Sequence, residues 1–521
     1  MLILAYTIAV LVMILLPVVV AVWWRRRVVV PWYLFCAGAA AFVVSQAYHI
    51  PLNNWLTDLG VIGPVAADAP KLLQTAVILG LSAGLSEGVA RAAAVGLLRR
   101  FNKAQRWTEG IMVGLGHGGI EAMLIGGVLV AASVSSLLSL QNTDLTSLNL
   151  SPEQLTAVEQ QLSFFLASPW AAVIPVIERM VAMSLHVVVT MMVWQAFVRR
   201  NPLYFVVGVG YHALVDTTAV YLSALAVPGW QMELIFAAAL IPGAIWLWWS
   251  RDKAELAAPH RITAVREEWR AFLTATRKEL LQQWRTRRVL VIWAVFLLFG
   301  LMSPLLAKFT PQMLTMVEGA EQFANLIPQP TINDAMTQYI KNITQFGFII
   351  AILVGMGAVA GEKERGTAAL ILSKPMPRWA FLLSKFVAQA MLYAVAFLLA
   401  ALATYYYTLV LFGPMDFVAF LLGSGLLWVW LLCYTAVTLL GSAIGDSVGA
   451  GAGLGLLGAV LLLLLGALPV IGPLAPSGLV AWASQMGLGA ATPNAGALAA
   501  SVILIVMLLI TSLAVFEEQE V

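Results

Sequence analysis

Residues 1–27 read MLILAYTIAVLVMILLPVVVAVWWRRR, an unbroken apolar run that ends in three arginines. An apolar run of about 20 residues is long enough to cross the hydrocarbon core of a bilayer as a helix. Because no basic residue precedes the run and three follow it, the order differs from that of a cleavable signal peptide. The positive-inside rule places the N-terminus outside the cell and Arg25–Arg27 in the cytoplasm. We expect residues 2–23 to form the first of several spanning helices.

The composition of the whole chain agrees with this first segment. Of its 521 residues, 61% are hydrophobic and only 11% are charged, whereas soluble globular domains carry about 25% charged residues. The low charge excludes a soluble enzyme, and a net charge of +3 leaves no basic face for a nucleic acid. Cys36 and Cys433 both lie in apolar runs, so we expect neither a disulfide framework nor a Cys-x-x-Cys site.

Further apolar runs predict an all-α, polytopic membrane protein with about thirteen spanning helices. The loops that the alternation places in the cytoplasm carry most of the Lys and Arg, as the positive-inside rule requires. The same alternation puts the C-terminus in the cytoplasm. The predicted spans are residues 2–23, 29–50, 71–98, 108–134, 170–198, 203–224, 231–249, 289–308, 342–360, 387–412, 417–443, 449–472 and 498–516.

One long polar stretch divides these spans into seven and six. We therefore expect a seven-helix domain at 1–250, a cytoplasmic linker at 251–288 and a six-helix domain at 289–521. Within the linker, apolar side chains that include two tryptophans recur at helical spacing. They predict an amphipathic helix from Arg266 to Trp284 that lies on the membrane surface.

The first seven helices carry ionisable residues of the kind that a bilayer normally excludes, and such residues mark function by default. Three pairs are four residues apart and so share a helix face. Four of the residues lie about 10–13 positions from the nearest cytoplasmic basic cluster, which puts them close to mid-bilayer. We therefore predict one buried catalytic site, made of Glu87, His117, Glu121, His186, His212 and Asp216.

Three chemistries fit these residue types. A glutamic protease would use Glu87 to activate water, with His117 and His212 polarising the scissile carbonyl. A metalloprotease would hold an ion such as zinc on His117, His186 and His212, although the chain has no HExxH motif. A serine protease would use Ser86 of a GxSxG match, but that motif belongs at a strand–turn–helix elbow. The structural alternative is that the histidines make hydrogen-bonded contacts between helices.

The motifs of this half resemble those of YhfC-type intramembrane peptidases, distant relatives of the CAAX-prenyl-processing and bacteriocin-processing (CPBP) proteases. The resemblance covers about residues 1–250 and implies an endopeptidase embedded in the membrane. The family pattern has two adjacent glutamates in its first motif, whereas this chain has one. A non-catalytic binding or sensor module, or an ion-conducting domain, therefore stays open for this half. The matching motifs are ExxxR at Glu87, GxxHGGxE around His117, ERx6H ending at His186 and HxxxD at His212.

The most informative stretch of the second half is GEKERGTAALILSKPMPR at residues 361–378. It predicts a short helix from about Thr367 to Leu372, bracketed by a charged turn and by Pro375. A compact charged segment at the inner membrane face is suited to dock on a soluble partner. A basic loop that only sets topology would explain the lysines and arginines but not the glutamates.

This stretch resembles the coupling region of ABC-2-type transporter permeases, with ExERGT followed by LxLSxP. The likeness covers about residues 262–521, including the six-helix plan and the preceding amphipathic helix. It implies a separate ATPase subunit, itself expected as a dimer. Because the chain has no GxxxxGK[ST] loop, ATP would be used only by that partner. The residues implied to contact the ATPase are Glu362, Glu364, Arg365, Gly366 and Thr367.

The two halves together predict a fusion of an intramembrane peptidase-like domain with an ABC-2 permease subunit. We expect a multi-pass protein of a prokaryotic plasma membrane that pairs with a second permease or with a copy of itself. Its substrate would be a membrane peptide or a small molecule exported with energy from the ATPase. No nucleic-acid partner is expected, and the only cofactor considered is the zinc of the metalloprotease alternative.

Overall fold

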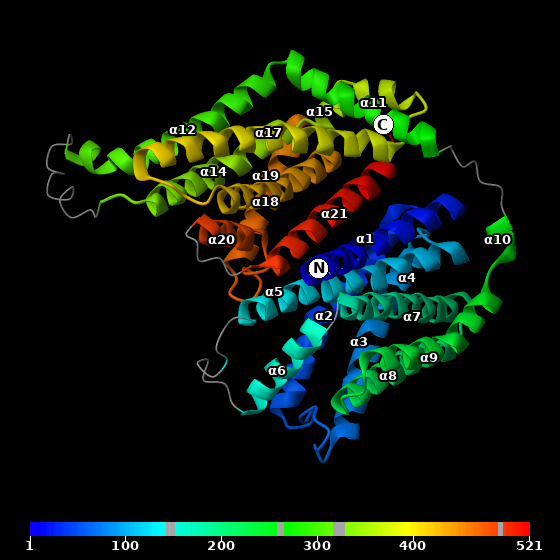
Figure 1. Ribbon diagram of the computed structural model, residues 1–521. Coiled ribbons are helices and arrows are strands. Elements are labelled where there is room, and N and C mark those ends of the chain that lie inside the picture. The colour runs from blue at the N-terminus through cyan, green and yellow to red at the C-terminus, as the bar shows by residue number, and fades with distance from the viewer. Residues whose placement is uncertain are drawn as a thin grey trace. The chain divides into compact units, whose positions relative to one another are not determined.

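A computed structural model describes residues 1–141, 145, 152–167, 169–257, 265–315, 329–487 and 493–520. These residues are predominantly helical and contain no strand, which confirms the all-α prediction. The chain forms two compact units, Met1–Ile262 and Thr263–Val521, and each is described by itself (Figure 1).

The first unit is a helical bundle in which one long span changes from α-helix to π-helix and back. Its elements are α1 (Leu2–Val28), α2 (Trp32–Asp58), α3 (Leu72–Arg100), α4 (Trp107–Glu121), the π-helix η1 (Ala122–Leu129), α5 (Val130–Leu140), α6 (Pro152–Ala167), the 3-10 helix η3 (Pro169–Ala172), α7 (Val173–Val198), α8 (Leu203–Ala224), α9 (Gly229–Ser250) and α10 (Lys253–Ala257).

The second unit begins with the amphipathic helix and continues into a bundle of long apolar helices. Its elements are α11 (Val265–Arg285), α12 (Arg288–Thr315), α14 (Ile332–Gly355), α15 (Ala360–Glu364), α16 (Thr367–Leu372), α17 (Arg378–Phe412), α18 (Phe417–Ile444), α19 (Val448–Ala467), α20 (Pro476–Gly487) and α21 (Ala495–Glu517).

Thirteen helical segments of the described chain are long and apolar enough to cross a membrane, seven in the first unit and six in the second. This confirms the predicted number; the side on which each terminus lies stays a prediction. Two helices begin well before the predicted spans, α14 at Ile332 and α17 at Arg378. Hydropathy detects only the apolar part of a helix, whereas the backbone hydrogen bonds continue through its polar ends. For the same reason, hydropathy did not predict the less apolar helix α6.

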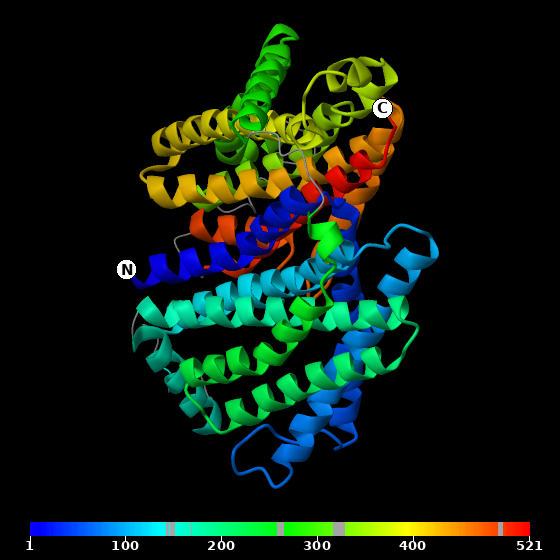
Figure 2. The same ribbon diagram turned by 90° about the vertical axis from the view of Figure 1, so that its right-hand side faces the viewer.

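Helix α4 is the central element of the first unit. Every residue from Thr108 to Glu121 is buried, because α2 and α7 pack on it; α3 packs along α8. Figure 2 shows α7, α8 and α9, in teal and green, running alongside one another. Helix α10 is tied to the same unit, since the Glu255 carboxylate accepts hydrogen bonds from the backbone N–H groups of Trp107 (3.0 Å) and Thr108 (2.9 Å).

Glycines allow the close packing of α2 against α4. A Cβ atom on Gly116 would lie 2.0 Å from the Phe35 carbonyl oxygen, and one on Gly38 would lie 2.0 Å from the Val113 carbonyl oxygen. Both obstacles are backbone atoms, which a rotamer change cannot move. Because His117 follows Gly116 directly, this packing also sets the position of the first candidate histidine.

Changing Gly116 to alanine is therefore expected to destabilise the first unit by about 1–3 kcal/mol, the usual cost of overpacking. The matched control is Gly210→Ala in α8, where the added Cβ would meet no atom within 4 Å; its stability should be unchanged or slightly raised, since alanine favours helix. Thermal unfolding of the purified chain in detergent measures both. Equal stabilities for the two variants would contradict this account of the α2–α4 contact.

Helix α18 is the centre of the second unit and packs against α14, α17, α19, α20 and α21. The glycines of α19 allow part of this packing. A Cβ on Gly451 would lie 2.5 Å from the Met356 carbonyl oxygen, and one on Gly458 would lie 2.3 Å from Val437 Cγ1. Small residues thus let these helices approach closely, which is typical of helix packing in membranes.

The predicted short helix is present with the predicted bounds, as α16 (Thr367–Leu372). Gly366 precedes it with a φ of +67°, a conformation that favours glycine. The amphipathic helix is also present, as α11 (Val265–Arg285), where the prediction had Arg266 to Trp284.

An ionic cluster joins α11 to the segment before α16. We define it as Lys278 and Glu279 of α11, Glu362 of α15 and Lys385 of α17. The Lys385 ammonium, on a side chain only 2% exposed, lies 2.9 Å from Glu279 Oε1 and 3.0 Å from Glu362 Oε2. Lys278 Nζ lies 2.8 Å from Glu279 Oε1 and 2.7 Å from Glu362 Oε1. The amphipathic helix is therefore held directly to the predicted ATPase-contacting segment.

Candidate active site in the first unit

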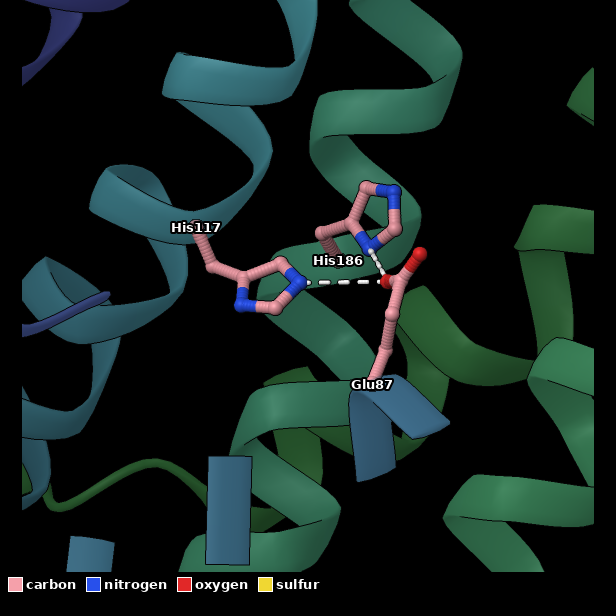
Figure 3. Close-up of side chains that lie close together, drawn as sticks. All are labelled: Glu87, His117 and His186. Carbon is pink, nitrogen blue, oxygen red and sulfur yellow. Dashed lines mark hydrogen bonds and ion pairs between the residues drawn. The ribbon is translucent and has the colours of Figure 1, made fainter. Parts of the chain in front are cut away.

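Glu87 is the centre of the candidate site. It lies within α3, it is only 6% exposed, and its Oε2 atom lies 2.8 Å from an Arg91 guanidinium nitrogen and 3.1 Å from His117 Nε2. The same oxygen lies 3.7 Å from His186 Nδ1 and 3.9 Å from His212 Nε2. Figure 3 shows one oxygen of this carboxylate facing the rings of both His117 and His186.

The three histidines come from three different helices and meet at one place. His117 lies in α4, His186 in α7 and His212 in α8, and all three are buried. The ring centroids of His117 and His186 are 5.3 Å apart, and those of His186 and His212 are 5.1 Å apart. The structure thus brings together the four residues that the sequence placed at one depth.

Two further carboxylates hold two of the imidazole rings. Glu121 forms a close ion pair with His186 Nε2, and Asp216 Oδ2 lies 3.3 Å from His212 Nε2. A carboxylate on one ring nitrogen fixes the orientation and the tautomer of a histidine. The other nitrogen of each ring, Nδ1, faces the Arg91 guanidinium, closely in His186 and at 3.5 Å in His212. All six residues predicted from the sequence therefore lie together here: Glu87, the three histidines around its Oε2 atom, and the carboxylates of Glu121 and Asp216 behind two of those histidines.

Local features of the helices explain how these side chains reach each other. A Cβ on Gly118 would lie 2.9 Å from the Cβ of His186 and 2.9 Å from the Cα of Met183, so glycine lets α7 approach α4 here. The π-helix η1 begins directly after Glu121, and such segments are frequent at functional sites. Ser86 lies inside α3 and not at a strand–helix turn, so the elbow that the serine alternative needs is missing here.

A cavity of about 260 Å³ opens beside Glu87, His186 and His212. It runs past Asp216 to Glu233, which lies near the N-terminal end of α9. Five of the six candidate residues thus line a cavity that a small part of a substrate can enter, whereas His117 is fully buried behind them.

The structure adds a polar network that the sequence analysis missed. Gln46 Nε2 lies 3.4 Å from Glu87 Oε1, and the ring of His49 lies 3.3 Å from Gln46 Oε1. His49 Nε2 lies 3.0 Å from Asn53 Nδ2 and 3.2 Å from Ser82 Oγ. The signal was Gln46, His49 and Asn53 at spacings of three and four residues, the first two inside the predicted span 29–50 and all three inside α2.

The donor atoms around Glu87 suit a metal ion. One ligand atom each from Glu87, His117 and His186 lie within 4.8 Å of one another, and all three residues are buried. Imidazole nitrogens with a carboxylate oxygen are ligands that zinc accepts, and the Glu121 contact to the far nitrogen of His186 is typical behind a metal ligand. The set contains Glu87 in place of the predicted His212. Arg91 now pairs with Glu87 Oε2 and also closely contacts His186 Nδ1, so a metal on these residues requires that both contacts be released.

In the second unit, the residues predicted to meet an ATPase differ in exposure. Thr367 is half-buried, and its hydroxyl donates to the Glu362 carbonyl oxygen at 3.1 Å. Glu362 is buried, and its carboxylate belongs to the ionic cluster. Glu364, Arg365 and Gly366 are exposed, and Glu364 Oε2 also accepts a hydrogen bond from the backbone N–H of Val448 at 3.0 Å. The exposed group is the part of this segment that a soluble partner can reach.

Comparisons with known proteins divide the chain in the same way. Residues 12–237 match the YhfC intramembrane metalloprotease family, and residues 273–521 match the ABC-2 family transporter proteins. The uncharacterized transmembrane protein YxlG of Bacillus subtilis (strain 168) is 27% identical over 194 residues, 37% of this chain and 75% of that protein. The uncharacterized membrane protein YhfC of the same organism is 27% identical over 128 residues, 24% of this chain and 49% of that protein. The match thus spans about half the length of this second relative.

Proposed function

Because this chain joins a YhfC-type membrane domain to an ABC-2 transporter membrane domain, we propose that it couples peptide cleavage in the membrane to export by an ABC transporter. The observation that supports cleavage most strongly is the convergence of Glu87 with three buried histidines from three other helices. The fusion would act in the plasma membrane of a prokaryote.

The proposed reaction is hydrolysis, in which water adds to the scissile carbonyl and a proton passes to the leaving amine. Glu87, His117 and His186 would hold a divalent ion, for which zinc is our candidate, and the bound ion would supply Lewis-acid activation. Glu121 keeps the His186 ring in place. His212, oriented by Asp216, lies outside the metal-compatible set and is placed to give the proton to the leaving group.

Metal analysis of the purified chain tests this chemistry. We expect about one divalent ion per chain, lost in His117→Ala, since a site rarely keeps its metal after losing one of three protein ligands. Hydrolysis should stop on chelation and return with zinc. Hydrolysis that survives chelation but not Glu87→Gln would favour the glutamic mechanism.

The hydrogen bonds from Asn53 and His49 through Gln46 are placed to orient the Glu87 carboxylate. We expect His49→Phe to lower the rate of hydrolysis about tenfold, less than the loss of a direct acid or base, and to shift the pH profile. The control is Asn54→Ala, an exposed neighbour that should leave both unchanged. Proteoliposome assays over a range of pH measure both the rate and the pH profile. A wild-type rate and a wild-type pH profile in His49→Phe would exclude this role of His49.

The pairing of Glu87 with Arg91 favours a second candidate function, a binding module without catalysis. The Glu87 carboxylate lies 2.8 Å from the buried Arg91 guanidinium, which offsets its charge. A purely structural ion pair has the same geometry. Peptide processing that is unchanged in both Glu87→Ala and His212→Ala would support this candidate.

An ABC-2 membrane domain implies an ABC transporter with a separate ATPase partner. We propose that this ATPase, as a dimer, contacts the exposed residues Glu364, Arg365 and Gly366, and that two permease chains pair above it. Reconstitution of the chain with its ATPase in vesicles tests this. Arg365→Glu should abolish the complex and nucleotide-dependent transport, whereas Arg266→Glu, the same charge change on the exposed face of α11, should not. A stable complex with Arg365→Glu would contradict the assignment.

A further inference from the structure

We infer that the cavity of the first unit selects peptides that carry a positively charged side chain, and that Glu178 and Glu233 bind this charge. The inference rests on the proposed function, because it names the substrate class of the same site.

The charge of the cavity lining is the first observation. Five carboxylates line the cavity, those of Glu87, Glu121, Glu178, Asp216 and Glu233, and Arg179 is the one Lys or Arg side chain among the lining residues that the structure describes. Arg179 is shared between Glu121, at 3.2 Å, and Glu178, and Arg91 pairs with Glu87, so these five carboxylates meet two guanidinium groups and keep an excess of negative charge. A low-dielectric cavity lined by carboxylates attracts a cation and rejects an anion.

Glu233 supplies the second, independent observation. It is 8% exposed and lines the cavity, and its Oε2 atom is buried without a hydrogen-bond partner. Buried carboxylate oxygens are strongly unfavourable without a donor, so such an atom normally gains a partner in the working state. A substrate ammonium or guanidinium group entering the cavity would provide that donor.

The position of Glu178 sets the expected distance, along the substrate, between the positive charge and the cleaved bond. Glu178 precedes His186 by eight residues in α7, which corresponds to about 12 Å along the helix. A peptide bound in the cavity as an extended segment, unwound from its membrane helix, would rise about 3.3 Å per residue. The positive side chain is therefore expected three or four residues from the bond that lies beside Glu87 and His186.

Binding assays with the full chain in nanodiscs test this inference. The chain carries Glu87→Gln so that binding is measured without turnover. The probes are two acetylated and amidated polyleucine peptides of about 20 residues, a length that spans the bilayer, and they differ only in one Lys or Gln four residues from the centre. We expect the Lys peptide to bind about tenfold more tightly, as for one charge-assisted contact.

Added substitutions locate the contact. Glu233→Gln should reduce the preference for Lys to less than about threefold, and Glu178→Gln, at a half-exposed side chain, should reduce it without threatening the fold. The control Asp68→Asn removes a charge from an exposed loop outside the cavity and should leave the preference intact. Equal affinity for the two peptides, or a preference that survives both glutamate substitutions, would overturn the inference.

The outcomes also separate this inference from the proposed function. A chain that prefers the Lys peptide but whose wild-type form never cleaves it would overturn the hydrolysis proposal and leave the binding site standing. A wild-type chain that cleaves both peptides equally, with equal affinity, would overturn only the inference.

Discussion

We expect replacement of Glu87 by glutamine to lower the rate of the proposed peptide hydrolysis by about a thousandfold, the middle of the range for losing a direct acid, base or activating group. Glutamine keeps the shape of the side chain but removes the charge that His117, His186 and His212 all face. In either mechanism considered above, metal or glutamic, this carboxylate acts on the reacting water or on the ion that activates it. Steady-state cleavage in proteoliposomes measures the loss.

A control is needed because the substitution also leaves Arg91, which is fully buried, without its closest carboxylate. Breaking a buried ion pair in this way costs about 3–5 kcal/mol. The double variant Glu87→Gln, Arg91→Met removes both charges and should recover much of the stability while remaining inactive. Recovery of activity together with stability would show that Glu87 acts through the fold and not through the chemistry.

Replacing Lys385 by methionine should destabilise the second unit by about 3–5 kcal/mol, because Glu279 and Glu362 lose their most buried partner. The same change should uncouple ATP hydrolysis from transport, since α11, α15 and α17 are held together at this point. Lys374→Met, at an exposed lysine in the segment between α16 and α17, is the matched control. The measurements are thermal unfolding and the ratio of transport to ATP hydrolysis. If Lys385→Met unfolds at the wild-type temperature and keeps the wild-type ratio of transport to ATP hydrolysis, the ionic cluster neither stabilises this unit nor couples the two activities.

The ionic cluster also predicts a dependence of stability on pH. Burial alone would raise the pKa of Glu279, but the Lys385 and Lys278 ammonium groups outweigh it and hold that pKa below its ordinary value of 4.5. A lowered pKa contributes stability that is present above the unfolded value and lost as the pH falls through the folded value. Acid unfolding of Lys385→Met should therefore begin at higher pH than that of the wild type. Identical acid transitions would contradict this.

At alkaline pH the dependence of stability on pH is reversed, because the group that titrates there is a lysine. Burial alone would lower the pKa of Lys278, but Glu279 and Glu362 outweigh it and raise that pKa above its ordinary value of 10.5. This contribution is fully present below pH 10.5 and disappears as the pH rises through the raised value.

Much of this structure could be predicted from single segments of the chain. Apolar runs identify the spans because a helix that crosses a bilayer requires only a certain length and an apolar composition. The ends of α16 were predictable because a glycine and Pro375 bracket it locally. The meeting of Glu87 with His117 and His186 followed from equal depth, because helices that cross one membrane place residues of equal depth in one layer.

The partner of each side chain could not be predicted in this way. Glu121 belongs to the site through His186 of another helix, and Glu362 turns inward to lysines that lie on α11 and α17. Such choices depend on how each helix is rotated about its axis, which depth and spacing within one helix do not determine. The contribution of His49 was missed for the same reason, since its path to Glu87 passes through Gln46.

Incorporation of ¹⁸O from labelled water tests most directly whether the first unit is a hydrolase. Vesicles from cells that express the wild-type chain, or its Glu87→Gln variant, are incubated in H₂¹⁸O, and membrane peptides with a new labelled C-terminal carboxyl are identified by mass spectrometry. Hydrolysis places one water oxygen in each new carboxyl, so we predict labelled termini with the wild type that are absent with Glu87→Gln. The same labelled termini in both samples, or none in either, would contradict the proposal that this chain cleaves peptides in the membrane.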